Sequence, residues 1–229
     1  MAWLSVGTVI AMGCGGDGGD GPPGSGGPVT RRAVVSAVAS APVDRLTFDA
    51  DPTVQPGDTL VALIEANGVD DIELTANPGW TLLADDLAVM CINPFHVFVL
   101  TTTFDDSTTF DFTFTTEDTF TALVTAYSGA ASAELLDFTR MGEKRQMQIL
   151  YPATTLAPGS IVFFGGAGQS TWSNLDTPIG PEDAPVISVA AVDNAATFEF
   201  ATADGAVPEI ELPNDNGMCA NVARLSIQP

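Results

Sequence analysis

The stretch Thr119–Gly129, TFTALVTAYSG, decides the fold class of this chain. Apolar and hydroxyl residues alternate along it, with Phe120, Ala122, Val124 and Ala126 set against Thr119, Thr121 and Thr125. Side chains on a β-strand alternate between its two faces. The pattern therefore predicts a central strand with one face in a packed core and small hydroxyl side chains on the other.

Shorter segments of similar composition lie on both sides of this strand, separated by Pro-Gly, Asn-Gly and Asp-Asp turns. The predicted strands are Ala33–Val38, Arg45–Phe48, Thr59–Glu65, Ile72–Thr75, Trp80–Leu83, Phe95–Thr103, Thr109–Thr115, Leu135–Thr139, Gln146–Leu150, Ser160–Gly165, Val186–Ala191, Thr197–Ala201, Glu209–Leu212 and Asn221–Ile227. Helical periodicity is absent from windows of about eleven residues or more. Turn signals recur about every eight to twelve residues, which predicts an all-β antiparallel sandwich or jelly roll.

Two segments of the chain resemble each other. VQPGDTLVA, residues Val54–Ala62, and LAPGSIVF, residues Leu156–Phe163, each place a Pro-Gly turn before an apolar strand. They are either equivalent positions in two halves of a pseudo-symmetric sandwich or a chance similarity between two strand starts.

The charge balance excludes one large class of partners. Among 229 residues, 29 are acidic and 7 are basic, which gives a net charge of -22. Nucleic acid is not an expected partner, because phosphate binding needs clustered Lys and Arg. Charged residues make up only 16% of the chain, so the imbalance reflects missing basic residues more than the dense carboxylate surface of a salt-adapted protein.

The first fourteen residues, MAWLSVGTVIAMGC, precede the predicted domain. The apolar run Trp3–Gly13 is too short to span a bilayer and fits the apolar region of a signal peptide. Gly13 and Cys14 resemble the lipobox of bacterial lipoproteins, in which the cysteine is acylated and becomes the mature N-terminus. The alternative is that Trp3–Ile10 forms a first strand of the fold.

The next segment, GGDGGDGPPGSGGP at residues 15–28, offers no apolar side chain to bury. Such a composition is typical of a flexible tether. The predicted organisation is therefore a lipoprotein signal segment at 1–14, a tether at 15–28 and a β-sandwich domain at 29–229.

Several motifs of the domain resemble, in order, those of a family of β-sandwich domains found in bacterial surface proteins and in phage tail or virion proteins. They are PGDTLVALIEANG (Pro56–Gly68), NPGWTLL (Asn77–Leu83), FHVFVL (Phe95–Leu100), ALVTAYSGA (Ala122–Ala130), APGSIVFFGGA (Ala157–Ala167) and NVARLSIQP (Asn221–Pro229). The resemblance implies adhesion, display or structural decoration and carries no shared catalytic residues. We therefore expect a protein that is not an enzyme.

The chain has three cysteines, Cys14, Cys91 and Cys219. If Cys14 is acylated and the domain is exported, the even remainder predicts a disulfide between Cys91 and Cys219. The alternative is two buried, unpaired cysteines.

Few residues suggest chemistry. His96 is the only histidine, and it lies inside a strand pattern without a G-x-S-x-G nucleophile motif, which predicts a structural role. Trp80 follows a Pro-Gly turn and enters an apolar strand, which favours core packing. Trp172 lies in a polar loop and is the predicted contact for a glycan.

No cofactor is expected, apart from calcium as an alternative. Asn214, Asp215 and Asn216 place three oxygen-bearing side chains in one turn, and oxygen is the ligand that calcium prefers. The competing interpretation is a solvated turn in which Asn216-Gly217 makes the bend.

These observations predict a non-catalytic interaction or structural module, exported and held at the outer membrane or cell surface by an N-terminal lipid. Its protein or glycan partner is not specified by the sequence. One alternative is a phage, virion or filament protein that assembles as an oligomer. The other is a carbohydrate-binding module in which Trp172 and nearby carboxylates line one concave face.

Overall fold

The computed structural model describes residues 27–68, 72–76, 79–88, 94–141, 148–168, 187–192, 194–213 and 219–229. All regular elements within these ranges are β-strands. In chain order they are β1 (Thr30–Asp49), β2 (Thr59–Ala66), β3 (Leu74–Ala76), β4 (Thr81–Leu87), β5 (His96–Thr103), β6 (Thr109–Ser128), β7 (Ser132–Met141), β8 (Gln148–Tyr151), β9 (Thr154–Thr155), β10 (Ile161–Gly168), β11 (Ile187–Val192), β12 (Ala195–Ala201), β13 (Ala206–Val207), β14 (Ile210–Pro213) and β15 (Ala220–Gln228).

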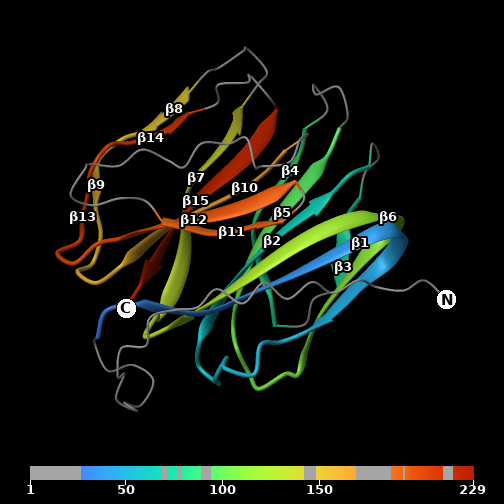
Figure 1. Cartoon of the computed structure of the whole chain (residues 1–229), viewed down its shortest axis with the longest axis horizontal. Helices are drawn as coiled ribbons and strands as arrows, with labels where there is room; N and C mark the ends of the chain where they lie inside the picture. The colour runs from blue at the N-terminus through green and yellow to red at the C-terminus, as the bar shows by residue number, and fades with distance from the viewer. Residues whose placement is uncertain are drawn as a thin grey trace.

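The strands form two main antiparallel sheets that pack face to face (Figure 1). The first sheet has the order β1-β6-β2-β5-β4, with β3 paired to β6. The second sheet has the order β11-β12-β10-β15-β7, and two small ribbons, β13-β9 and β14-β8, complete the fold. The predicted all-β antiparallel sandwich is confirmed. In the described ranges there is no helix long and apolar enough to cross a membrane.

Two pairs of predicted strands are single long strands in the structure. β1 and β6 have 20 residues each and stay paired along their lengths. Residues 40–44 and 116–118, which separate the predicted strands, lie at irregularities in the ladder, and Val43 pairs with Asp118 there. A β-bulge bends a strand without ending its pairing. The prediction of separate strands was therefore wrong at these two places.

The bend in the β1-β6 ribbon covers the outer face of the first sheet. Leu46 and Phe48 of β1, with Phe110, Phe112 and Phe114 of β6, belong to one buried cluster with side chains of β2 and β5. We call this cluster the outer core. The aromatic rings contact one another, as in the Phe48–Phe110 pair with ring centroids 5.5 Å apart.

A second cluster, the intersheet core, lies between the two sheets. It joins Val61, Leu63 and Leu123 of the first sheet to Phe163 and Leu225 of the second. A third cluster lies on the far face of the second sheet, where the small ribbons cover β10 and β12. Each sheet is thus buried on both faces. The threonine face of the central strand lies in the interior too, because Thr121 and Thr125 are fully buried.

The two sheets have the same topology. Strands β1, β2, β4, β5 and β6 occupy the same relative places in the first sheet as β7, β10, β11, β12 and β15 in the second. Even an irregularity recurs, because β4 has a bulge between Leu82 and Ala84 and β11 has one between Ser188 and Ala190. The protein is therefore built from two halves with one strand order, and the similarity of the two Pro-Gly segments marks equivalent positions.

The turns before β2 and β10 confirm this equivalence at the level of single hydrogen bonds. The amides of Gly57 and Gly159 donate to the carbonyls of Phe104 and Thr202, at 2.9 and 2.8 Å. Phe104 and Thr202 donate in return to Asp58 and Ser160, at 2.8 and 2.9 Å. Both glycines have φ in the left-handed region, 92° and 81°, where side chains with a Cβ are strained.

Replacing Gly159 by alanine should destabilise the fold more than replacing Gly79. A Cβ on Gly159 would lie 3.0 Å from the Pro28 Cα, whereas one on Gly79 would meet only the Thr102 hydroxyl at 3.8 Å. Both glycines have positive φ, so each substitution should cost about 1–2 kcal/mol of unfolding free energy. Gly159→Ala should cost about 1 kcal/mol more. Denaturant unfolding of both variants measures the difference, and equal losses would contradict the Pro28 contact.

Candidate functional site

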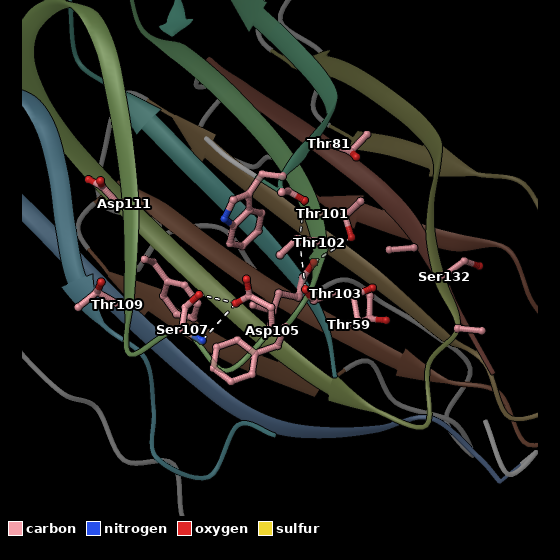
Figure 2. Close-up of a pocket in the computed structure, with 17 residues that line it drawn as sticks. Thr59, Thr81, Thr101, Thr102, Thr103, Asp105, Ser107, Thr109, Asp111 and Ser132 are labelled. Carbon is pink, nitrogen blue, oxygen red and sulfur yellow. Dashed lines mark hydrogen bonds between the residues drawn. The ribbon is translucent and has the colours of Figure 1, made fainter. Parts of the chain in front are cut away.

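A cavity of about 720 Å³ opens at the end of the first sheet where β4 begins and β5 ends. Figure 2 shows Asp105, Ser107, Thr109 and Asp111 on one side of this strand end, and Thr59, Thr81, Thr101 and Ser132 on the other. Among the described residues, the lining is Thr59, Leu60, Gly79, Trp80, Thr81, Thr101, Thr102, Thr103, Phe104, Asp105, Ser107, Thr109, Phe110, Asp111, Ala131, Ser132 and Ala133.

Trp80 provides the largest ring of the cavity wall. It packs against Phe110 and Phe112, with ring centroids 6.0 and 5.3 Å away. The ring is only partly buried, while Phe110 beneath it is buried. The sequence-based prediction that Trp80 packs in a core is confirmed, and the structure adds that the same residue lines the cavity.

Several hydroxyl groups of the lining are held in place by backbone carbonyls. Thr101 donates to the Leu60 carbonyl at 2.9 Å, and Thr102 donates to the Gly79 carbonyl at 2.7 Å. A hydroxyl that donates in this way keeps its lone pairs available as acceptors. These threonines therefore present oriented acceptor groups rather than freely rotating ones.

The two carboxylates of the lining are also fixed. Asp105 accepts hydrogen bonds from the hydroxyl and amide of Ser107, which lower the pKa of the Asp105 carboxyl. Asp111 accepts from Arg45 Nε at 2.7 Å and from the Thr47 hydroxyl at 2.9 Å. The hydrogen bond from Arg45 is the main cause of the lowered pKa of Asp111. Both groups are thus ionised acceptors at neutral pH.

The cavity walls suit binding better than catalysis. The titratable groups among its described lining residues are two carboxylates with lowered pKa values, and a general acid or base needs a pKa near the working pH. The histidine is engaged elsewhere: His96 Nε2 contacts Asp85, and its ring stacks on Phe98 with centroids 4.3 Å apart. This agrees with the structural role expected for it. Among the described residues, no group of three or more His, Cys, Asp or Glu side chains could hold a metal ion.

Most residues singled out from the sequence lie outside the described ranges. These are Cys14, Cys91, Trp172, Asn214, Asp215 and Asn216. The acylation, disulfide, glycan-contact and calcium predictions attached to them therefore stay predictions. Cys219, the other half of the predicted disulfide, is half-buried beside the intersheet core just before β15.

A buried polar network links the two sheets at the opposite edge of the sandwich. Glu199 of β12 accepts a hydrogen bond from the Tyr127 hydroxyl at 2.7 Å and one from Arg31 Nη1 at 3.0 Å. Tyr127 is fully buried and Glu199 is 7% exposed. Loss of hydration is the main cause of the raised pKa of both Glu199 and Tyr127.

No family model, curated protein or solved structure matches this chain. The assignment of a site therefore rests on its geometry.

Sequence patterning missed the cavity because its described residues come from four separated stretches of the chain, at 59–60, 79–81, 101–111 and 131–133. One local signal was present. The run Thr101–Thr103 follows the apolar residues 97–100 at the end of β5, and Thr81 pairs with Thr101 in the ladder. Threonine is a common strand residue, so this signal by itself does not distinguish a binding surface from ordinary strand chemistry.

Substitutions at Glu199 and Asp111 should have opposite pH dependence. Burial raises the pKa of Glu199, so its contribution to stability is fully present below the unfolded value, near 4.5, and declines as pH rises through the folded value. The contribution of Asp111 is present above its unfolded value, near 3.8, and is lost as pH falls through the folded value.

Denaturant unfolding between about pH 2.5 and pH 7 tests these signs, because the Asp111 carboxyl titrates below its unfolded value. Relative to the unmodified protein, Glu199→Gln should become more stable as the pH rises, because the unmodified protein loses the contribution of Glu199. Asp111→Asn should become less stable over the same range. Parallel curves for the two variants would contradict the assigned pKa directions.

Proposed function

We propose that this protein is a non-catalytic interaction module, exported and held at the outer membrane or cell surface by a lipid on Cys14. The observation that supports it best is the cavity at Trp80, which combines aromatic, hydroxyl and fixed carboxylate groups without a paired acid and base. Such a surface can recognise a ligand, and its described lining residues do not include an acid and base pair for bond cleavage.

The N-terminal sequence supports the proposed anchor. The apolar run Trp3–Gly13, the lipobox-like Cys14 and the Gly-rich segment at 15–28 stand in the order of signal, anchor and tether. The described domain begins with Val29, which is buried and donates its amide to the Gly159 carbonyl at 2.9 Å. A tether that ends at this point would join the domain at Val29, a residue held by burial and by this backbone hydrogen bond.

The described residues around the predicted disulfide lie close together. Asn221, two positions after Cys219, donates from Nδ2 to the carbonyl of Asp86 at the end of β4, at 3.4 Å. Ala88 and Cys219 both pack with the intersheet core. Cys91 follows Ala88 by three positions in the β4-β5 connection. This arrangement supports a Cys91–Cys219 disulfide that would join the two halves of the chain.

Intact mass of the chain expressed with its native N-terminus in a Gram-negative host tests the anchor. We expect the mass of a protein cleaved before Cys14 plus acyl chains, and Cys14→Ser should abolish the acylated species. A matched Cys91→Ser variant should still be acylated. An unprocessed chain that begins at Met1 would overturn the proposed localisation and favour an assembling structural protein.

The disulfide has its own test. Reduction should lower the unfolding free energy by about 2–4 kcal/mol, because the bond closes a long loop in the unfolded chain. The double variant Cys91→Ser/Cys219→Ser should match the reduced protein and should no longer respond to reductant. If the oxidised protein and the double variant have equal stability, the pairing is wrong.

A further inference from the structure

We propose that the cavity at Trp80 binds a neutral saccharide. This inference rests on the proposed interaction function and names the ligand class of the same site. It differs from the sequence-based expectation, which placed the glycan contact at Trp172.

The pseudo-symmetry of the fold explains why there is a cavity at this place. The ladders make Thr101, Ala133 and Ile227 the equivalents of Glu199, Arg31 and Tyr127. At one edge of the sandwich the large ion-paired residues fill the space between the sheets. At the other edge their small equivalents Thr101 and Ala133 line the cavity. The cavity therefore lies where small side chains stand at the positions equivalent to Glu199 and Arg31, so the space between the sheets is not filled there.

The hydroxyl lining is not required by the fold. In the second half, Thr59, Thr81, Thr101, Thr102 and Thr103 are replaced at equivalent ladder positions by Ile161, Ile187, Glu199, Phe200 and Ala201. The same strand order thus forms with apolar residues at most of these positions. The concentration of hydroxyl groups is a property of this end of the first half, where the cavity lies.

The chemistry of the lining matches a sugar. The partly exposed ring of Trp80 offers a flat apolar surface for the C–H face of a pyranose, and the fixed threonine and carboxylate oxygens offer acceptors for sugar hydroxyl groups. The volume falls within the range of about 300–1,000 Å³ that small-molecule sites occupy.

The charge of the site selects against acidic sugars. The part of the lining that the structure describes contains Asp105 and Asp111 and no basic residue, and Arg45 is already paired with Asp111. An anionic sugar would bring its carboxylate or sulfate toward Asp105 without a cation to receive it. A neutral hexose-based oligosaccharide avoids this repulsion.

The full chain carrying Cys14→Ser, which cannot be acylated, is probed on an array of neutral and acidic oligosaccharides. Calorimetry then measures the affinity for the strongest neutral hit. Trp80→Ala should weaken binding about tenfold or more, as expected for a central aromatic contact. Thr101→Val/Thr103→Val keeps the shape of both side chains and should weaken binding about three- to tenfold.

Two matched controls separate the cavity from other surfaces. Trp172→Ala removes the other candidate tryptophan, and Thr155→Val makes the same threonine change on β9, outside the cavity lining. Both should bind as the parent chain does. Far-ultraviolet circular dichroism and the unfolding midpoint verify folding, and the threonine variant decides the question if Trp80→Ala is unfolded.

Three results would overturn the saccharide proposal. The first is that Trp172→Ala loses binding while Trp80→Ala keeps it. The others are that acidic sugars bind more strongly than neutral ones, or that the folded chain binds no saccharide on the array. The intact-mass measurement of N-terminal processing is independent of all three results. Failure of the ligand assignment is thus distinguishable from failure of the proposed surface anchor.

Discussion

All eight residues of β2 and all eight of β10 are buried, so the central strand of each sheet must be covered on both faces. A two-sheet sandwich alone covers one face of each sheet. The remaining faces are covered by the bent β1-β6 ribbon on the first sheet and by the small ribbons on the second. Gly165 leaves space for the Phe163 ring of the same strand, because a Cβ there would lie 2.6 Å from that ring. The length of β1 and β6 and the presence of the minor ribbons follow from this requirement.

The shared strand order of the two halves makes their differences informative. A packed protein interior leaves few voids, so large and small side chains at equivalent places have different consequences. Arg31, Glu199 and Tyr127 close one edge of the sandwich with hydrogen bonds that satisfy a buried carboxylate. Their small counterparts leave the opposite edge open. The same positions thus carry hydrogen bonds between the sheets at one edge and line the cavity at the other.

Basic residues are scarce, and each arginine in the described ranges forms an ion pair with an aspartate or a glutamate. The ion pairs are Arg31–Glu199, Arg32–Asp58, Arg45–Asp111, Arg140–Asp86 and Arg224–Asp137. Arg224 is almost completely buried and also lies over the Tyr151 ring, 5.0 Å from its centroid. Loss of one partner of a buried pair leaves an uncompensated charge, which is more costly than loss of an exposed pair. With these cations engaged, the electrostatic field outside the protein is set by carboxylates.

The sequence by itself determined the all-β class, the central strand and the two equivalent strand starts, because period-two patterns and Pro-Gly turns are encoded by neighbouring residues. It also pointed to the acidic character and to the structural role of His96. Only the tertiary structure decided that β1 and β6 are continuous, since the ladder resumes on both sides of the bend and Val43 pairs with Asp118 within it. The cavity was likewise beyond sequence patterning. Trp80 precedes β4, Thr101 and Asp111 lie on two other strands of the first sheet, and Ser132 begins β7 of the second. These residues meet only in the folded chain, and the space between them depends on which large side chains are missing there.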